Sequence, residues 1–473
     1  MEARKPGDQW PRRLLLPAAT LLLSAAAVAI AAPLTSRDSN SETVMKITAP
    51  FMVTAVGDII EPQPLYSDDP AFQKLVGRIR QADVGFGNME SSLVDFRTFQ
   101  GPVAGTEAPL ETGDAIKAMG ITLMSRANNH AFDGGVMGMI STDEALDKLG
   151  IAHAGTGRNL QEARAAHYIE TPKGRVGLVS MFSVDDSSSY GPNFVKTEAT
   201  YRNGNLGGAP GLNPLHLTTY HVVGPEQLQM LRQIAASVYG NRESGGPVAA
   251  GPDRFRFFDE WYQDGADVGS LHYEMNPNDE RDILQSIRNG KTFADFLIAT
   301  IHTHQTTNYD ALGVKGVVDH NAADFLVKLA HDSIDNGADM FVAHGVHALH
   351  GVEIYNGKPI FYGVSNFVFQ FGLQVESAYD IMATAKEKSA HENPGNQETV
   401  LTTSRFEGGK LQEVRLYPVD LGGSRRPLSQ MGIPLTPSPA EAQRILQELQ
   451  EFSQPFGTRI SIEDNVGVIR PGR

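Results

Sequence analysis

From residue 45 onward, short runs of apolar residues alternate with longer segments in which apolar residues recur at helical spacing. Residues 51–56, for example, predict a buried strand that ends at Gly57-Asp58, and residues 70–81 predict a helix with one apolar face. Strands that alternate with helices are typical of α/β proteins, in which neighbouring strands are mostly parallel. We therefore predict an α/β fold.

The same criteria predict the other elements of the chain. Strands are predicted at 84–86, 121–125, 176–182, 296–301, 340–343, 352–355 and 359–362, with two more in 400–420 joined at Gly408-Gly409. Helices are predicted at 114–119, 141–149, 225–239, 279–289, 322–336 and 440–452. Residues 183–255 are rich in Ser, Gly, Pro and Asn, so we interpret them as a loop-rich insertion that faces the substrate.

The first 32 residues have the layout of a targeting segment. Four basic residues within the first 13 precede the almost entirely apolar segment 14–32, and Ala29-Ile30-Ala31 is a small-x-small cleavage signal. This layout predicts a secretory signal peptide, and Arg12-Arg13 before the apolar run also fits twin-arginine export. The alternative is an uncleaved membrane anchor, because about 20 apolar residues can span a bilayer.

These patterns divide the chain into four parts. Residues 1–32 are the signal peptide or anchor, 33–45 a linker, 46–420 the main domain and 421–473 a C-terminal extension with one helix. We expect a periplasmic or secreted protein, or a protein that faces outward while residues 14–32 hold it at the membrane.

Charge and cysteine content exclude several classes of function. The formal net charge of −15 repels a phosphate backbone, so nucleic acid is not an expected partner. An anionic ligand would need a local cationic site, for which a bound metal is the natural candidate. The chain has no cysteine, which excludes disulfides, thiolate metal sites and a cysteine nucleophile.

Side chains with metal-binding chemistry follow five of the predicted strands. They are Asp58, Glu90, Asn129 with His130, His302 with His304, and His344 with His347. The carboxyl ends of strands line the ligand crevice of open α/β sheets, so we expect these side chains to converge. Carboxylate, imidazole and amide oxygen together suit zinc, manganese, iron(II) or nickel. Such an ion activates a water molecule, and a histidine outside the ligand set can protonate a leaving group.

Each signal also has a purely structural interpretation. A Gly-Asp pair after a strand is typical of a turn, Glu90 can be a helix-start carboxylate, and Asn128-Asn129-His130 can form a polar turn. His302-Thr303-His304 is more specific, because alternate residues of a strand face the same side. The occurrence of all five signals in chain order favours a common metal site.

Several stretches resemble the bacterial capsule-synthesis family often labelled CapA or PGA_cap. They are TAVGDII, GFGNMESSL, RANNHAFDGGVMG, GIAHAGTGRNLQEAR, IHTHQ and the run from 336 to 370. The resemblance extends from about residue 48 to about residue 372, with the segments in the same order. That family is similar to the calcineurin-like metallophosphoesterases, which implies a β-sandwich of two sheets flanked by helices and a metal site at the strand ends.

The resemblance also implies roles for the candidate residues. It makes metal ligands of Asp58, Glu90, Asn129, His302 and His344 or His347, and it makes His130 the catalytic histidine. The metallophosphoesterases usually begin with Asp-x-His, whereas Ile60 stands at the second position here. His304 then becomes the candidate for the vacant ligand position, and the number of metal ions, one or two, stays open.

Two functions of different class follow from the resemblance. The first is an exported metal-dependent hydrolase that cleaves an amide, such as a γ-glutamyl bond, or an ester by metal-activated water. The alternative is a non-enzymatic accessory factor for the synthesis, export or anchoring of a poly-γ-glutamate capsule. In both cases the expected ligand is anionic, either a small molecule or a polymer such as poly-γ-glutamate. Phosphoesterase activity would rest on analogy of fold alone.

Overall fold

The computed structural model describes residues 44–103, 106–185, 199–200, 207–239, 248–249, 251–258, 260–307, 319–370 and 392–472. The predicted signal peptide or anchor at 1–32 lies outside these residues, as does nearly all of the predicted linker. Among the helices of the described part, none has the length and apolar character needed to cross a bilayer.

The first large sheet is built around β1. Over the described residues its nine strands run in the order β23 (Ser461–Glu463), β24 (Val466–Ile469), β22 (Lys410–Asp420), β21 (Glu398–Glu407), β1 (Phe51–Ile60), β2 (Val84–Met89), β5 (Leu123–Ser125) and β6 (Ala152–Ala154), with β20 (Asn366–Phe369) also beside β1. Strands β1, β2, β5 and β6 are parallel, so their carboxyl ends lie at one edge.

The second large sheet has β9 and β16 near its centre. Its eleven described strands run in the order β12 (Val248–Ala249), β13 (Arg254–Phe257), β14 (Glu260–Asp264), β11 (Pro214–Val223), β9 (Gly174–Asp185), β16 (Phe296–His302), β17 (Met340–His344), β19 (Lys358–Phe361) and β18 (Val352–Tyr355), with β8 (His167–Thr171) beside β9 and β15 (Leu271–Met275) beside β11. Strands β9, β16 and β17 are parallel.

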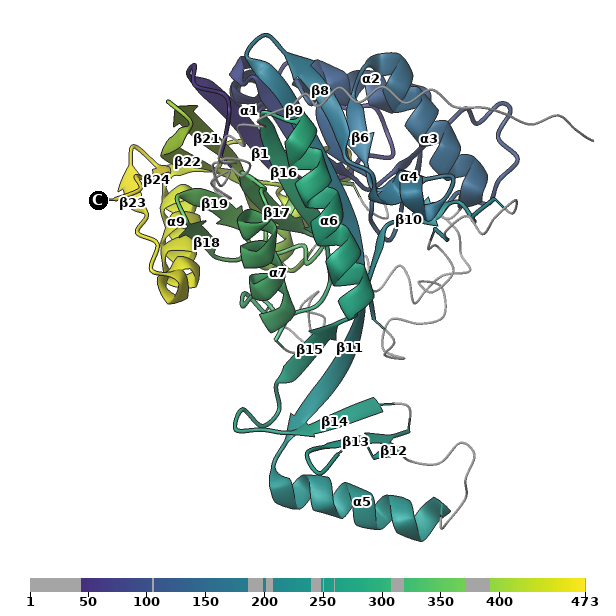
Figure 1. Ribbon diagram of the computed structural model, residues 1–473. Coiled ribbons are helices and arrows are strands. Elements are labelled where there is room, and N and C mark those ends of the chain that lie inside the picture. Colours follow the sequence, from purple (N-terminus) through teal and green to yellow (C-terminus); the bar gives the residue numbers. More distant parts are fainter. Residues whose placement is uncertain are drawn as a thin grey trace, which may run out of the picture. The chain divides into compact units, whose positions relative to one another are not determined.

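Helices cover the outer faces of both sheets (Figure 1). The first sheet carries α1 (Pro70–Gln81), α2 (Leu110–Met119) and α3 (Gly135–Leu149), and the second carries α6 (Pro277–Phe293) and α7 (Asp324–Asp335). The smaller elements are α4 (Leu160–Arg164), α5 (Pro225–Tyr239), α9 (Pro439–Ser453), the pairs β3 (Ser92–Val94) with β4 (Glu107–Pro109) and β7 (Thr156–Gly157) with β10 (Gly211–Leu212), and the 3-10 helices η3 (Pro394–Gln397), η4 (Gly423–Arg425), η5 (Leu428–Gln430) and η6 (Gln454–Phe456).

The inner faces of the two sheets share one apolar core. Phe51 of β1 packs on Phe296 of β16 with ring centroids 5.3 Å apart, and Phe296 packs on Phe406 of β21 at 5.0 Å. The core also takes in apolar residues from β2, β9, β17 and α9. The predicted α/β class is confirmed, and the layers form a metallophosphoesterase-like sandwich flanked by helices.

Several predicted elements differ in extent from the structure, and two of these differences change the architecture around the site. Strand β1 does not end at Gly57-Asp58 but continues to Ile60, because its second half pairs with β20. The described part of 183–255 is also more regular than its composition suggests. Strand β11 pairs with β9 through Pro214–Leu217 and with β14 through Tyr220–Val223, so this segment extends the second sheet. Residues 186–198, 201–206 and 240–247 lie outside the description.

A buried ion pair joins α6 to the start of β17. The Nζ atom of Lys291 lies 2.6 Å from Oδ2 of Asp339, and the side chains are 2% and 1% exposed. The same carboxylate oxygen accepts the backbone N–H of Leu297 at 2.9 Å. Burial lowers the pKa of Lys291, and the Asp339 charge opposes this shift. Lys291 is the nearer of two lysines that compensate this buried carboxylate, since Nζ of Lys358 lies 3.5 Å from Oδ1 of Asp339.

We expect Lys291→Met to lower the free energy of unfolding by about 3 kcal/mol, because Asp339 would stay buried and lose its nearer cation, with Lys358 left at 3.5 Å. Urea denaturation with the metal site in a single defined state measures the change. The matched control is Arg97→Met, which removes a pair with Asp95 in which the arginine side chain is 85% exposed. Equal losses in the two variants would contradict a structural role for the buried pair.

Candidate metal centre

The alternation of side chains along β16 and β17 determines which histidines point into the space between the sheets. Ile298 of β16 and Val342 of β17 belong to the core between the two sheets. Because side chains alternate between the two faces of a strand, His302 and His344 point the same way. The two histidines are also direct neighbours in the parallel pairing of β16 with β17. Both side chains are fully buried.

A bulge in β1 turns Asp58 toward the same space. Ala55 pairs with Phe86 and Asp58 pairs with Asn88, so β1 holds one more residue than β2 over this interval. Ala55 faces the core between the sheets, and the extra residue brings Asp58, rather than Gly57, onto that face. The carboxylate therefore meets the histidines of the second sheet.

Glu90 reaches the same space from the end of β2. It is in phase with Phe86, which faces the core between the sheets, and with Asn88. Its backbone N–H donates to the carbonyl of Ile59 at 3.1 Å, which ties it to β1. The Glu90 side chain is fully buried.

Asp58 stands among three histidines. Its Oδ1 lies 3.3 Å from Nδ1 of His344 and 3.7 Å from Nδ1 of His302. Its Oδ2 lies 3.5 Å from Nδ1 of His347. The Nδ1 atoms of His302 and His344 are themselves 3.0 Å apart, so two potential metal-ligand atoms lie side by side.

The opposite side of the His302 ring faces a second set of donors. Its Nε2 lies 3.1 Å from Nε2 of His304 and 3.6 Å from Oε1 of Glu90. Within the described residues, three overlapping groups are close enough to share an ion: Asp58 with His302 and His344, Glu90 with His302 and His304, and Asp58 with Glu90 and His347. The structure thus brings six of the predicted ligands into one cluster.

The predicted residues Asn129 and His130 follow β5 on the loop before α3. The Oδ1 atom of Asn129 is buried and has no hydrogen-bond partner among the described residues. His130 is close enough to His302 for its charge to contribute to the lowered pKa of that ring. The Nδ1 atom of His130 lies 2.7 Å from Oδ2 of Asp133, which also accepts a hydrogen bond from the Thr106 hydroxyl at 2.6 Å.

The unpaired donor atoms indicate whether this cluster suits a metal. Both carboxylate oxygens of Glu90, Nε2 of His344 and Oδ1 of Asn129 are buried without a hydrogen-bond partner in the described part of the chain. Buried polar atoms of this kind cost several kcal/mol each unless something compensates them. One or two divalent cations bound in the cluster would compensate such atoms, and the donor types match those of zinc, manganese, iron and nickel sites. The residues present therefore fit a metal ion.

The charge states of the buried groups agree with this reading. Burial, followed by the charges of Asp58 and Asp133, raises the pKa of Glu90 well above its usual range. Burial, followed by the neighbouring histidines, lowers the pKa of His302 well below its usual range. The His302 ring is therefore neutral near pH 7, which is the form that binds metals. Burial is the largest single influence on Asp58 and opposes its ionisation, but His344, His347 and Asn88 together outweigh it and the pKa of Asp58 is lowered.

Amide side chains hold the ionised residue in place. The Nδ2 atom of Asn88 donates to Oδ1 of Asp58 at 2.8 Å, and the backbone N–H of Gly345 donates to Oδ2 at 3.0 Å. The Oδ1 atom of Asn88 accepts from Nδ2 of Asn128 at 3.0 Å. On the other side, Nδ1 of His347 lies 2.7 Å from Oδ1 of Asn366. Supporting partners of this kind commonly orient metal ligands.

The sequence analysis missed these supporting residues. Asn88 could have been found from strand phase, because it precedes Glu90 by two residues and therefore shares its face. Asn128 and Asp133 flank the predicted pair Asn129-His130 in the same loop. Asn366 carries no comparable signal, since only the fold brings it beside His347.

Strained backbone accompanies the close approach of chain segments at this site. His347 and Ser365 adopt positive φ angles of 53° and 56°, which are costly for residues other than glycine. The Ser365 carbonyl accepts the backbone N–H of Asp58 at 3.1 Å. A Cβ atom at Gly57 would lie 1.8 Å from that carbonyl oxygen, so only glycine allows the contact.

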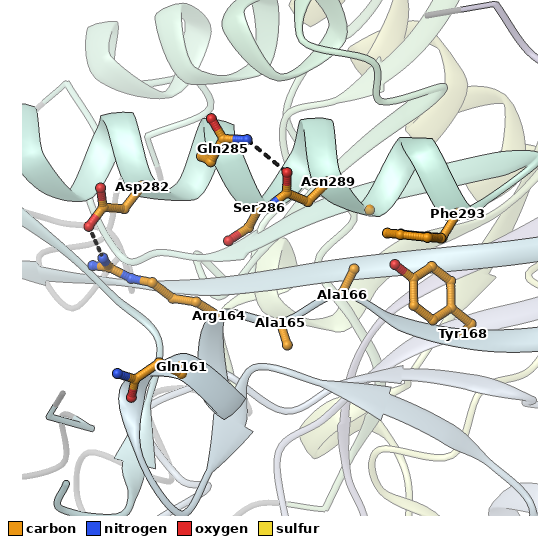
Figure 2. Close-up of a pocket in the computed structure, with 11 residues that line it drawn as sticks. Gln161, Arg164, Ala165, Ala166, Tyr168, Asp282, Gln285, Ser286, Asn289 and Phe293 are labelled. Carbon is orange, nitrogen blue, oxygen red and sulfur yellow. Dashed lines mark hydrogen bonds and ion pairs between the residues drawn. The ribbon is translucent and has the colours of Figure 1, made fainter. Parts of the chain in front are cut away.

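A pocket of about 480 Å³ beside α4, β8 and α6 contains none of the predicted site residues. Figure 2 shows Arg164 at one end of it and Tyr168 with Phe293 at the other. The arginine donates to Asp282 at 2.9 Å and also pairs with Asp279, so its charge is already compensated. We therefore assign the chemistry to the buried cluster and not to this pocket.

Fold and cluster together define a metallophosphoesterase-like α/β protein with donor side chains at the strand ends. The chain belongs to the family of bacterial capsule synthesis proteins named PGA_cap, whose family model matches residues 51–371. This confirms the family predicted from the sequence motifs.

Sequence similarity to known proteins extends beyond residues 51–371. An uncharacterised protein, y4sH, of Sinorhizobium fredii (strain NBRC 101917 / NGR234) is 38% identical over 465 residues, which cover 92% of this chain and 96% of that protein. The PGA biosynthesis protein CapA of Bacillus subtilis (strain 168) is 23% identical over 64% of this chain and 58% of its own length. The capsule biosynthesis protein CapA of Bacillus anthracis is 22% identical over 76% of this chain and 66% of its own length.

The raised pKa of Glu90 makes the stability of the metal-free protein depend on pH. The folded state keeps a proton on Glu90 that the unfolded chain loses above its ordinary pKa, near 4.5. Stability contributed in this way is present below that value and is lost as pH rises through the folded pKa. In the presence of a chelator, Glu90→Gln should remove this decline, because an amide does not titrate.

Urea denaturation between about pH 5 and pH 8 measures this slope. Glu111→Gln, on the exposed face of α2, is the matched control and should keep the slope of the parent protein. A Glu90→Gln variant with the parent's slope would contradict the assignment.

Proposed function

We propose that this chain is an exported metal-dependent hydrolase that cleaves an amide bond, with an ester as the other candidate. The proposal rests on one observation above all: Glu90, Asn129 and His344 carry buried donor atoms that have no partner among the described residues. A bound metal would offset the cost of such a set, and a metal-dependent hydrolase needs one.

The residues that would hold the ion or ions are Asp58, Glu90, Asn129, His302, His304, His344 and His347. A bound divalent ion would polarise the scissile carbonyl and lower the pKa of a water molecule, as in other metal hydrolases. Asp58 contributes a carboxylate that His344 keeps ionised, and Asn88 orients it. His302 contributes a neutral ring.

His130 is the residue we assign to proton transfer. Its side chain is 20% exposed, so a substrate group can approach it, whereas His302 and His344 are fully buried. The carboxylate of Asp133 lies 2.7 Å from Nδ1 of His130 and orients the ring. His130 would then donate a proton to the leaving nitrogen or oxygen as the bond to the carbonyl carbon breaks.

The substrate class follows from the relatives and from charge. A Bacillus subtilis relative is named as a PGA biosynthesis protein, which makes a γ-glutamyl amide of poly-γ-glutamate the first substrate to test. The chain itself has a formal net charge of −15, so it offers a polyanion little general attraction. A metal ion in the cluster would supply the local positive charge that such a substrate requires.

A second candidate function is an accessory role in capsule assembly without hydrolysis. The observation that favours it is that both Bacillus relatives are named for biosynthesis. In this case the metal site would stabilise the fold or bind the polymer, and His130 would be dispensable for capsule formation in cells.

Export is the remaining part of the proposal, and its support is the N-terminal sequence. Segment 14–32 would direct the chain through the cytoplasmic membrane, either by the general secretory route or by twin-arginine export of the folded, metal-loaded protein. The mature chain would then be periplasmic or secreted, or would stay anchored and face outward.

His130→Ala should keep its metal and fold and lose about 10²–10⁴-fold in turnover, which is the usual contribution of a general acid. Asp58→Ala should lose metal as well as activity. Metal analysis of the purified variants, together with release of glutamate from γ-linked oligomers, separates the two roles. The control is His331→Ala. His331 lies on α7, outside the cluster, and pairs with Glu353 of β18. A metal-free or fully active His130→Ala protein would be incompatible with these roles.

Cleavage of the signal should leave mature protein that begins close to residue 32. N-terminal sequencing of protein recovered from the periplasm or medium measures this. Protein that keeps Met1 and fractionates with membranes would favour the anchor, and protein that keeps Met1 and stays in the cytoplasm would contradict export. Replacing Arg12-Arg13 by two lysines should block export only if the twin-arginine route is used.

A further inference from the structure

Arg126 is fully buried beside the loop that carries Glu90. It is among the largest side chains of the described residues that have no exposure to solvent. Its Nη1 atom donates to the carbonyls of Met89 at 3.3 Å and Ser91 at 3.4 Å, the two residues that flank Glu90. Its Nε atom donates to Oδ1 of Asp143 on α3 at 3.3 Å.

Burying a guanidinium is costly, so this arginine needs an explanation. Burial lowers the pKa of Arg126, and the charge of Asp143 compensates only in part. Its Nη2 atom is buried with no hydrogen-bond partner in the described residues. An apolar side chain of similar volume would avoid these costs and would often be as stable. Packing alone therefore does not account for an arginine at this position.

Backbone contacts also tie the Glu90 turn to the end of β1, since the Glu90 N–H donates to the carbonyl of Ile59 at 3.1 Å and the Ser91 hydroxyl accepts the Glu61 N–H at 3.0 Å. The carboxylate of Glu90 has no hydrogen-bond partner among the described residues, so the side chain does not hold itself in place. The Met89 carbonyl accepts a second bond, from Nδ2 of Asn128 at 2.7 Å. Arg126 and Asn128 thus bind this turn from the segment that continues into Asn129 and His130.

We propose that Arg126 is a positioning residue for the metal centre: it sets the spacing between the Glu90 turn and the Asn129-His130 segment. The planar guanidinium donates to the carbonyl before Glu90 and to the carbonyl after it. Asp143 on α3 accepts from Nε and so fixes the orientation of the guanidinium. A lysine has the charge but not the rigid fork that reaches all three acceptors together. The inference rests on the metal centre of the proposed function and not on the hydrolytic reaction.

Zinc binding to chelator-treated protein tests this role without a substrate. Titration against a competing chelator should give about 10- to 100-fold weaker affinity for Arg126→Met, the usual effect of losing a partner that orients metal ligands. Arg126→Lys should fall between Arg126→Met and the parent. All measurements are made at a temperature at which circular dichroism shows each metal-free variant to be folded.

Thr156→Val is the matched control. The Thr156 hydroxyl donates to the same Asp143 oxygen at 3.0 Å, but the residue has no hydrogen bond to the Glu90 turn. It should lower the melting temperature of the metal-free protein and keep the zinc affinity of the parent. If Arg126→Met does not fold, Arg126→Lys and Asp143→Asn carry the test.

The outcomes separate this inference from the proposed function. Parent-like zinc affinity in the folded Arg126 variants would overturn the positioning role and leave the metal centre intact. Equal losses of affinity in Thr156→Val and the Arg126 variants would show a general effect of stability and would also overturn it. A parent protein that binds neither zinc nor manganese would overturn the metal centre, and the positioning role with it.

Discussion

The two sheets turn one face of each strand toward a shared interior, and polar side chains stand on that face at the ends of β1, β2, β16 and β17. Asp58 and Glu90 are buried there, and within the described residues their ion pairs are with histidines alone. Burial raises the pKa of Glu90 and, with mutual repulsion, lowers the pKa of His302, so burial favours the neutral form of both groups in the metal-free protein. A divalent cation would allow Glu90 to ionise, because it compensates a buried carboxylate and binds neutral imidazole.

The same constraint explains why the backbone is unusual at this point. Asp58 reaches the interior only because β1 gains a residue between Ala55 and Asp58, and the bulge brings Gly57 against the carbonyl of Ser365. Ser365 itself adopts a positive φ angle, as does His347, whose ring lies beside Asp58. Strain of this kind persists only where surrounding contacts enforce it, and it is common at functional sites. Local conformations that cost stability are therefore concentrated where the donors converge.

Local signals in the sequence predict some elements well, whereas elements that depend on contacts between distant residues are missed. Helices α1 and α5 were predicted at their observed bounds, because proline begins each of them and helical spacing carries through. The continuation of β1 to Ile60 was missed, because it depends on pairing with β20, some 300 residues away. Strand β11 was missed, because the residues around it in the sequence are rich in Ser, Gly, Pro and Asn, a composition that suggests loops. The candidate ligands were predicted from residue type at strand ends, whereas Asn366 depends on contacts that only the fold creates.

The loop after β5 shows how one short segment can serve two purposes. Asn129 has a buried amide oxygen, whereas the side chain of His130 is 20% exposed and is oriented by Asp133. Neighbouring residues in a turn point in different directions, so one can face an ion while the other faces a substrate. Such a division works only if the loop stays fixed relative to Glu90. Arg126, at the start of this loop, donates to the carbonyls on both sides of Glu90. The loop that carries Asn129 and His130 is therefore bonded directly to the Glu90 turn.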